Sequence, residues 1–254
     1  SDELAKSIQG KSKKIRIVSC YSKSKKKRIN FSKKYKTNCH DSYNSIIKDS
    51  NIDAVILTTP HSLHAKHAIQ ALQNGKHVFV EKPMATKYLD AKKMYLTAKK
   101  YKKILSVGHN RRYSSVYDFI NNLNRNKKIG KILHIDSNFS ASGALNYKKK
   151  FWRASRKESP GGAIAGLGIH MIDLMCFFGG QVKSVQSLVK KYAVKVNIDD
   201  TTSALFEFNK NCTGNLTTIF ACPYTTTFNV FGTNMNIFSD VDKNKIKIVN
   251  KNGK

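Results

Sequence analysis

The chain has 254 residues, of which 40% are hydrophobic and 10% aromatic, so it can bury a core and wholesale disorder is excluded. Its 46 Lys and Arg residues outnumber its 16 Asp and Glu residues, which gives a formal net charge of +30. A nucleic-acid surface needs such charges gathered on one face, whereas lysine is spread here through nearly every segment. We therefore interpret the charge as a lysine-rich solvated coat and do not expect nucleic acid as the main partner.

The first part of the chain alternates strand and helix signals. The expected strands cover residues 15–20, 54–58, 77–80 and 104–107, and the expected helices begin near residues 29, 60 and 86. The run at 54–58 is a nearly continuous apolar stretch, which is typical of a strand buried on both faces. This alternation predicts βαβ units, and hence an α/β fold with a Rossmann-type doubly wound parallel sheet.

The pattern changes after Gly108. Alternating runs predict strands of a mostly antiparallel sheet over residues 132–139, 182–189, 203–208, 214–220 and 228–231. Helices are expected near 116–123 and, as an apolar stretch, over 169–178. We therefore predict a dinucleotide-binding domain over residues 1–108 and an α+β domain with a large open sheet over residues 109–254.

The start of the chain differs from that of a complete nucleotide-binding domain, which opens with a strand, a Gly-rich turn and a helix that holds the pyrophosphate. The opening string SDELAKSI instead resembles the end of that first helix. We infer that the first strand and the G-x-G-x-x-G loop lie upstream. The chain is then a fragment, and we expect it also to stop before its last strands.

The cysteine and histidine patterns indicate in which compartment the protein works and whether it binds a metal ion. The five cysteines are odd in number and form no C-x-x-C pair, which favours a reducing cytoplasm over a disulfide scaffold. No stretch approaches the roughly 20 apolar residues of a spanning helix, so we expect no membrane partner, although a chain without an initial Met leaves a removed leader open. His61, His64 and His67 recur every three residues and diverge around a helix, so we expect no metal site.

The most specific short string is Glu81-Lys82-Pro83, which follows the expected strand at 77–80. Ligands of parallel sheets bind beyond the carboxyl ends of the strands, so Glu81 and Lys82 are expected at that edge. Pro83 restricts the backbone where it leaves the strand. Taken alone, Lys82 can equally be one more surface lysine.

Three longer strings stand in order along the chain: DAVILTTPHSLHAKHAIQALQNGKHVFVEKP (53–83), SVGHNRRY (106–113) and GGAIAGLGIHMIDLM (161–175). Together they resemble, in order and spacing, the Gfo/Idh/MocA family of NAD(P)-dependent oxidoreductases. The resemblance covers almost the whole chain. It implies a Rossmann domain for the nicotinamide cofactor, a second domain for a small-molecule substrate, and assembly into homodimers or tetramers.

The resemblance also implies roles for residues of the first domain. Lys82 becomes the acid/base near the nicotinamide and a substrate contact, and Glu81 holds the nicotinamide ribose. The T-P-x-x-x-H segment lines the cofactor cleft, and its members are Thr59, Pro60, His61 and His64.

The remaining implied roles fall near or in the second domain. The G-x-N-x-R segment maps onto Gly108, Asn110 and Arg112, with Asn110 toward the cofactor and Arg112 toward the substrate. His170 becomes the other proton-transfer group, and Asp173, one turn later, faces the substrate. A histidine packed under the sheet stays open as the alternative for His170.

The chemistry of these residue types fits hydride transfer. Oxidising a secondary alcohol needs a base for the hydroxyl proton, while the cofactor takes the hydride. A lysine serves once desolvation and nearby cations lower its pKa, whereas a histidine titrates near neutrality without tuning. His170 and Asp173 are three residues apart, so they share one face of a helix.

Substrate contacts are less sharply defined. Gly166 stands where the commoner family pattern has an Asp that contacts a substrate hydroxyl, which leaves the substrate open. Trp152 and Arg153 are candidate substrate contacts, because they offer an aromatic face for a sugar and a cation for a carboxylate or phosphate. A core Trp beside a surface Arg is the equal alternative.

Cofactor choice depends on the residues after the strand at 15–20. An NAD enzyme places an acidic side chain there, whereas the 2′-phosphate of NADP needs its absence and a nearby cation. The chain reads YSKSK at residues 21–25, so we prefer NADP over NAD and name Ser22 and Lys23 as cofactor contacts.

The leading hypothesis is an oxidoreductase that transfers a hydride between NAD(P) and a secondary alcohol or ketone of a sugar, cyclitol or cyclic diol. One alternative is a basic, non-catalytic binding protein on the same scaffold. The other is an inactive fragment that lacks its phosphate loop.

Overall fold

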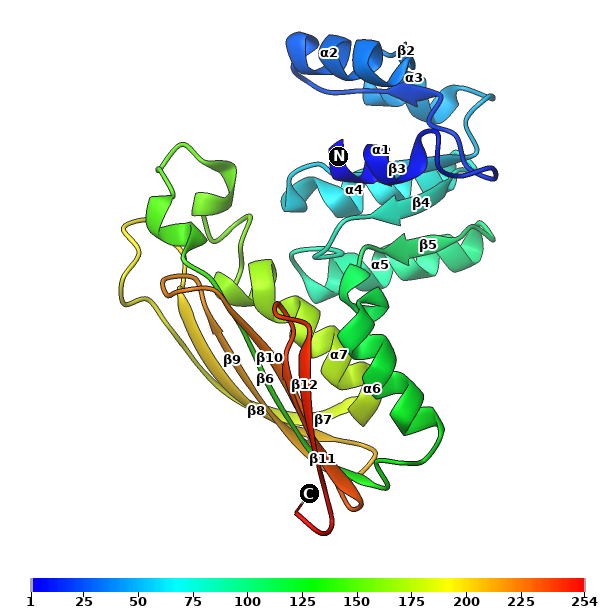
Figure 1. Ribbon diagram of the computed structural model, residues 1–254. Coiled ribbons are helices and arrows are strands. Elements are labelled where there is room, and N and C mark those ends of the chain that lie inside the picture. Colours follow the sequence, from blue (N-terminus) through cyan, green and yellow to red (C-terminus); the bar gives the residue numbers. More distant parts are fainter. Residues whose placement is uncertain (1, 254) are drawn as a thin grey trace. The chain divides into compact units, whose positions relative to one another are not determined.

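A computed structural model describes residues 2–253, and the chain folds into two compact units (Figure 1). The first unit contains Ser1–Thr59 and Leu63–Gly108. The second contains Pro60–Ser62 and His109–Lys254. No helix among residues 2–253 is long and apolar enough to cross a membrane.

The first unit is built on a three-stranded parallel sheet in the order β3-β4-β5. The strands are β3 (Ala54–Leu57), β4 (His77–Val80) and β5 (Leu105–Val107), and they are connected by helices α4 (His61–Gln73) and α5 (Tyr88–Lys100). Right-handed crossovers explain why consecutive helices cover one face. The predicted parallel sheet is confirmed.

Burial in β3 differs from the expectation of a strand covered on both faces. Val55 and Leu57 are buried in the core with Leu72 and Met94 of the crossover helices, whereas Ile56 between them is 40% exposed. The two helices cover only one face of this sheet, so the intervening side chain stays accessible. The strand therefore alternates in burial although its sequence does not alternate in polarity.

The first half of this unit holds shorter elements, which are α1 (Asp2–Ile8), β1 (Ser19–Cys20), α2 (Lys25–Tyr35), β2 (Asn38–Cys39) and α3 (Tyr43–Lys48). The strand predicted at 15–20 shrinks to β1, which pairs in parallel with β2. Before it, the backbone N–H of Ile17 donates to the side chain of Gln9 instead of to a neighbouring strand. Helix α2 begins earlier than predicted because Ser24 caps it by accepting a hydrogen bond from the N–H of Lys27.

The second unit is a seven-stranded sheet in the order β12-β11-β10-β6-β9-β8-β7. Its strands are β6 (Ile132–Ser140), β7 (Val182–Lys190), β8 (Thr201–Phe208), β9 (Cys212–Ile219), β10 (Thr225–Gly232), β11 (Met235–Asp240) and β12 (Lys245–Asn250). Within this sheet, as described for residues 2–253, β6 and β9 form the one parallel pair and the other pairs are antiparallel, so the predicted mostly antiparallel sheet is confirmed. Sequence patterns did not predict β11 and β12.

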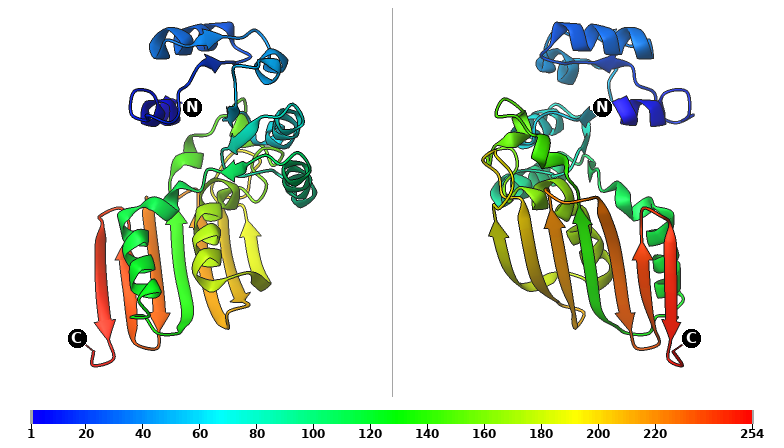
Figure 2. Two further views of the ribbon diagram at one scale, coloured as in Figure 1. Left: turned by 90° about the vertical axis from the view of Figure 1, so that its right-hand side faces the viewer. Right: turned by 60° about the vertical axis from the view of Figure 1, so that its left-hand side comes forward.

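Two helices cover one face of this sheet, α6 (Ser115–Arg125) and α7 (Ile169–Gly179) (Figure 2). Tyr117 and Ile120 of α6 and Met171 and Leu174 of α7 are buried in the core beneath them. A short π-helix (Ile164–Gly168) leads directly into α7. Gly162 lies just before it with φ +49°, and a Cβ there would come within 1.6 Å of the Asp199 carbonyl oxygen, so this entry requires glycine.

Candidate active site

Three strand ends of the first unit meet at one edge of its sheet. Thr59 follows β3, Glu81 and Lys82 follow β4, and Gly108 follows β5. Backbone hydrogen bonds join these ends, from Glu81 N–H to the Leu57 carbonyl and from Gly108 N–H to the Val80 carbonyl, both 2.9 Å. The carboxyl edge of a parallel sheet is where α/β folds bind ligands.

The Glu81 carboxylate lies against Gly108. A Cβ on Gly108 would be 3.3 Å from Glu81 Oε2 and 3.2 Å from the Phe79 ring, so the missing side chain leaves room for the carboxylate. Glu81 Oε2 also accepts a hydrogen bond from the N–H of Lys82. Lys82 itself is half-buried and precedes a cis peptide bond to Pro83.

His64 is fully buried beneath this edge. Its Nδ1 lies 2.8 Å from the Pro83 carbonyl oxygen and its Nε2 lies 2.9 Å from the Thr59 carbonyl oxygen. The ring thus joins the segments that follow β3 and β4. The family resemblance assigns His64 to the lining of the cofactor cleft, and in the structure its ring is buried between these two carbonyls.

Thr59 offers the most direct test of whether this edge suits a polar ligand. Its Oγ1 is buried, and among residues 2–253 it finds no hydrogen-bond partner. Buried hydroxyls normally have one, because desolvation without a hydrogen bond costs free energy. The strand-end edge therefore combines a carboxylate with a buried hydroxyl that has hydrogen-bonding capacity to spare, which is the kind of polar lining that a ligand rich in hydroxyl groups needs.

Ser22 and Lys23 lie in the loop between β1 and α2. Lys23 is exposed, and the Ser22 carbonyl accepts a hydrogen bond of 3.3 Å from Arg28, whose guanidinium also pairs with Asp41. Arg28 lies at the end of the basic run at residues 23–28. Its side chain is only 13% exposed, so it is a fixed cation rather than a mobile one.

In the second unit, His170 and Asp173 lie one turn apart on α7, and His170 is only 7% exposed. The Asp173 carboxylate accepts hydrogen bonds from Arg112 Nε at 2.7 Å and from its terminal nitrogen at 2.5 Å. This pairing raises the pKa of Arg112. His109 joins the cluster, with its ring 6.2 Å from that of His170 and its Nδ1 3.9 Å from Asp173. The structure therefore gathers His170, Asp173 and Arg112, whereas Asn110 lies exposed at the start of the 3₁₀ helix η1 (Asn110–Tyr113).

A second cluster of this unit surrounds Trp152. The His61 ring meets the Trp152 ring edge-on at 4.8 Å, and the Arg153 guanidinium lies over the indole at 4.7 Å. Glu158 fixes the neighbouring backbone, because its carboxylate accepts hydrogen bonds from both the N–H and the hydroxyl of Ser62. Pro60, which precedes His61 in the chain, is half-buried. The segment Pro60–Ser62 belongs to the second unit.

The structure explains the departure at Gly166. A Cβ there would come within 2.1 Å of the Phe220 ring, so Phe220 fills the space that an Asp side chain would need. Phe220 is itself 7% exposed and packs with Ala163 in a small core. This position therefore offers an aromatic wall where the common pattern offers a carboxylate.

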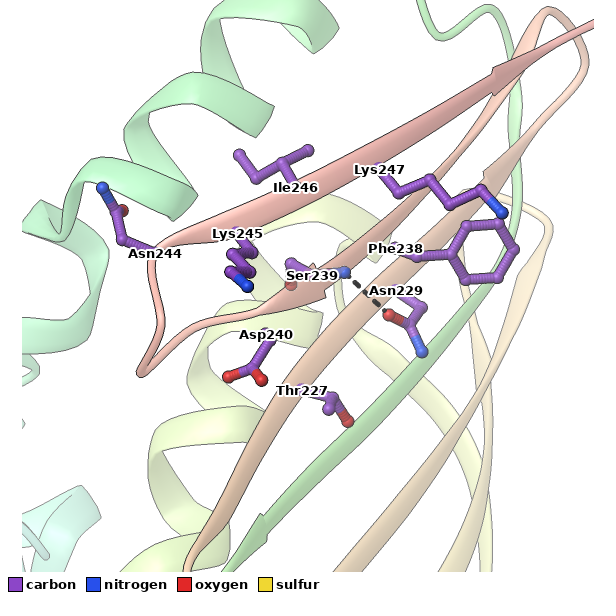
Figure 3. A pocket seen from close by; sticks show the side chains of 9 residues that line it. All are labelled: Thr227, Asn229, Phe238, Ser239, Asp240, Asn244, Lys245, Ile246 and Lys247. Carbon is purple, nitrogen blue, oxygen red and sulfur yellow. Dashed lines mark hydrogen bonds between the residues drawn. The ribbon is translucent and has the colours of Figure 1, made fainter. Parts of the chain in front are cut away.

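Among residues 2–253 no group of three or more His, Cys, Asp or Glu side chains is placed to hold a metal ion. A hollow of about 720 Å³ lies over β10–β12, where Asn229 accepts a hydrogen bond from the Ser239 N–H (Figure 3). It is open and is lined by none of the candidate site residues, and its only acidic side chain, Asp240, already pairs with Lys243.

Family profiles match both units. The profile described as "Oxidoreductase family, NAD-binding Rossmann fold" matches residues 1–109, and the profile described as "GFO/IDH/MocA C-terminal domain" matches residues 117–238. The chain belongs to the Gfo/Idh/MocA family of oxidoreductases. The resemblance carried by the three sequence strings is thereby confirmed.

Named members of this family are similar to the chain. Glucose-6-phosphate 3-dehydrogenase from Bacillus subtilis (strain 168) is 38% identical over 133 residues, which are 51% of this chain and 38% of that protein. Trans-1,2-dihydrobenzene-1,2-diol dehydrogenase from Xenopus tropicalis is 29% identical over 172 residues, which are 67% of this chain and 50% of that protein. The alignments thus span half or less of these curated relatives.

A solved structure extends the likeness over almost the whole chain. It comes from Desulfitobacterium hafniense and is assigned as an NADPH-dependent oxidoreductase. The two chains superimpose with a TM-score of 0.88 at 30% identity, over 93% of this chain and 68% of that one. The nucleotide-binding fold and the open-sheet fold of the family are therefore both present.

Three residues of this Gfo/Idh/MocA chain escaped sequence reasoning. His109 lies inside the string SVGHNRRY, so its neighbourhood to Arg112 was a usable signal. Glu158 and Phe220 gave no such signal, because each acts on a residue far away in the chain. Their contacts to Ser62 and Gly166 exist only in the folded state.

Proposed function

We propose that this protein is an NAD(P)-dependent oxidoreductase that transfers a hydride between the nicotinamide cofactor and a secondary alcohol or ketone of a sugar, cyclitol or cyclic diol. The observation that carries the proposal is the strand-end edge at which Glu81 and Lys82 follow β4 and the Glu81 carboxylate lies against Gly108. The relatives named as sugar and diol dehydrogenases support the substrate class.

Residues at the strand ends of the first unit, together with a few assigned by the family resemblance, would hold the cofactor. We assign the nicotinamide ribose to Glu81, whose carboxylate can accept hydrogen bonds from two hydroxyls. The buried Thr59 hydroxyl and the Pro60–His61 segment would line the same site, and Asn110 would contribute an amide. His64 would act on the cofactor indirectly, because it fixes the carbonyls of Thr59 and Pro83.

We assign the hydroxyl proton to Lys82 and His170. The bound nicotinamide supplies or accepts the hydride, and the protein has to remove or deliver the proton at the same carbon. Lys82 is half-buried at the ligand edge of its sheet, a setting that desolvates an ammonium group. His170 is held by its burial on α7, where Arg112 neutralises the nearby Asp173.

The second unit would bind the substrate. The Arg112–Asp173 pair can donate to and accept from neighbouring hydroxyls, and Trp152 with Arg153 offers an aromatic face bearing a cation. Phe220 replaces a substrate-binding carboxylate with a ring, which suits a less polar face of the substrate.

For the cofactor we propose a preference for NADP over NAD. Ser22 and Lys23 offer a hydroxyl and a cation for a 2′-phosphate, while Arg28, which pairs with Asp41, donates to the Ser22 carbonyl and fixes this loop. The variant Lys23→Ala should weaken NADPH binding about 10-fold and leave NADH binding nearly unchanged. Equal losses for both cofactors, measured by fluorescence titration, would refute the phosphate contact.

The decisive experiment couples cofactor reduction to a substrate panel. NAD⁺ or NADP⁺ reduction at 340 nm is followed with sugars, cyclitols and cyclic diols, and turnover of at least one class is expected. Because the chain carries a net charge of +30, binding of polyanions is the competing function. Polyanion affinity that collapses with added salt, without any turnover or dinucleotide binding, would establish that alternative instead.

We further propose a homo-oligomer that covers the open face of the seven-stranded sheet, in a reducing cytoplasmic setting. Leu188 and Leu205 are 68% and 58% exposed on β7 and β8, which is apolar area that a second copy can bury. The five cysteines are all free thiols. Sedimentation at increasing concentration should show dimers or tetramers, and a monomer throughout would contradict the proposal.

A further inference from the structure

The ring of Phe139 on β6 packs beside three side chains, those of His170, Tyr224 and Arg111. Its ring lies 6.0 Å from the His170 ring and 5.8 Å from the Tyr224 ring, measured between centroids. The guanidinium carbon of Arg111 lies 4.8 Å from the centre of the same ring. Phe139 is buried, so it connects the histidine with an arginine and a tyrosine that no role yet uses.

Arg111 is held in place by two partners. Its guanidinium stacks on Phe139, and one terminal nitrogen donates a hydrogen bond of 3.3 Å to the Tyr224 hydroxyl. A stacked and hydrogen-bonded guanidinium has given up much of its rotamer freedom before any ligand arrives. Its remaining N–H groups are therefore preorganised donors.

Arg111 and Arg112 are neighbours in η1, but only Arg112 forms an ion pair among the described residues. Arg112 donates to both oxygens of Asp173, which neutralises that pair. Successive residues of a 3₁₀ helix point about 120° apart, so Arg111 faces another direction. Among residues 2–253 no carboxylate lies within ion-pairing distance of Arg111, so the surroundings of His170 keep one uncompensated, oriented positive charge.

We propose that Arg111 and Tyr224 form an anion subsite that binds the phosphate or carboxylate of an acidic polyol while the reacting hydroxyl lies at His170. The proposal rests on the proposed function and narrows its substrate class from polyols in general to polyols that carry an anionic group. The Arg111 fork matches the oxygens of either anion. Because the Tyr224 oxygen accepts from Arg111, its own proton is available to the anion as a further donor.

The dimensions fit one small substrate. The Arg111 guanidinium carbon lies 4.8 Å, and the His170 ring centre 6.0 Å, from the centre of the Phe139 ring. These two distances together set an upper limit on the separation between the guanidinium and the His170 ring. Within that upper limit, a six-carbon sugar can place an acidic group at one end and the oxidised hydroxyl along its ring. Tyr224 is 53% exposed, so the subsite opens to solvent at the end where an acidic group would enter.

The test compares a hexose 6-phosphate, a hexuronate and the parent hexose in the same assay. The measured quantity is the ratio of kcat/KM for each acidic sugar to that for the neutral one, and wild type should show a ratio above about 10 for at least one acid. Arg111→Gln should lower this ratio about 10- to 100-fold, and Tyr224→Phe about 3-fold to 10-fold. Arg125→Gln, which removes an exposed arginine from the end of α6, serves as the charge control and should leave the ratio unchanged.

A merely structural role for Arg111 would lower kcat/KM for acidic and neutral sugars equally, leaving the ratio at its wild-type value, and that result overturns the subsite. A wild-type ratio near 1 overturns it as well. The phosphate and carboxylate arms show which anion the subsite prefers. The proposed function fails separately, by the absence of cofactor reduction with every sugar. Calorimetric binding of the three sugars to wild type and Arg111→Gln then still tests the anion contact.

Discussion

The Asp173 carboxylate on α7 accepts two parallel hydrogen bonds from one edge of the Arg112 guanidinium, from Nε at 2.7 Å and from a terminal nitrogen at 2.5 Å. The pair ties the α7 helix to the 3₁₀ helix η1, and the Asp173 side chain is only 11% exposed. Replacing Arg112 by Ala leaves this carboxylate nearly buried without its counter-charge. We expect the free energy of unfolding in urea to fall by about 2 kcal/mol.

The variant Arg112→Lys separates charge from geometry, because a lysine keeps the charge but cannot donate from two nitrogens held in one plane. It should fall between wild type and Arg112→Ala. Arg125→Ala is the matched control and should change the stability by no more than about 0.5 kcal/mol. If Arg112→Ala unfolds at the same urea concentration as wild type, the pair adds nothing to stability.

Lys82→Ala tests the proton-transfer assignment. The variant should lower kcat about 100-fold, the usual scale for a general acid or base, while cofactor binding stays within a few-fold of wild type. Lys92 is an exposed lysine on α5, and Lys92→Ala controls for the loss of one positive charge from a lysine-rich chain. Unchanged turnover in Lys82→Ala, measured at saturating cofactor, would remove Lys82 from the mechanism.

The sequence was sufficient wherever the pattern was local. Apolar runs at β3 and β4 and alternation at β6, β8 and β9 predicted both sheets, because burial on one or two faces leaves a period in the chain. The Glu81-Lys82 string was placed correctly at a strand end for the same reason. Strand β1 shows the limit, since a β-branched run forms a ladder only where a neighbouring strand supplies hydrogen-bond partners.

The candidate site shows the same limit at the level of side chains. His64 looks like a cleft residue in its motif, yet its surroundings bury it between two carbonyls. The Glu158 contact joins residues 96 positions apart, and no periodicity encodes such a pair. Gly166 could be recognised as a departure from the family pattern, but only the packed structure identifies Phe220 as the group that takes the space.

Gly166→Asp should therefore fail to restore a carboxylate by itself. The new side chain would overlap the Phe220 ring and bring a charge into a packed site, so we expect a loss of about 3 kcal/mol or more in the free energy of unfolding. Phe220→Ala alone costs about 3–5 kcal/mol through the cavity it leaves. In the double variant Gly166→Asp/Phe220→Ala, the aspartate side chain fills part of the cavity left by the missing ring. The loss in free energy of unfolding should therefore be smaller than the sum of the two single losses by about 1 kcal/mol or more. Additive losses would show that Phe220 does not occupy the space of the missing carboxylate.

Asp200 directly precedes β8, and its carboxylate accepts hydrogen bonds from several backbone N–H groups. Because these bonds favour the ionised carboxylate, Asp200 makes the stability of the fold depend on pH. Burial favours its neutral form, but hydrogen bonds from the N–H groups of Val194, Ala193 and Tyr192 outweigh it and lower the pKa of Asp200 below the usual value. A carboxyl with a depressed folded-state pKa stabilises the fold above its unfolded pKa of about 3.9, and this contribution is lost as the pH falls through the folded pKa. Asp200→Asn should therefore lower the free energy of unfolding by about 2 kcal/mol at about pH 7.

The difference between wild type and Asp200→Asn should shrink below about pH 4 and nearly vanish once the wild-type carboxyl is protonated, because the two side chains are then both neutral. Urea unfolding at a series of pH values measures it. Asp242→Asn, at an exposed position beyond β11, provides the control and should cost no more than about 0.5 kcal/mol at neutral pH. A deficit of Asp200→Asn that stays constant from neutral to acid pH would mean that shape, and not the charge held by the three N–H groups, is what Asp200 contributes.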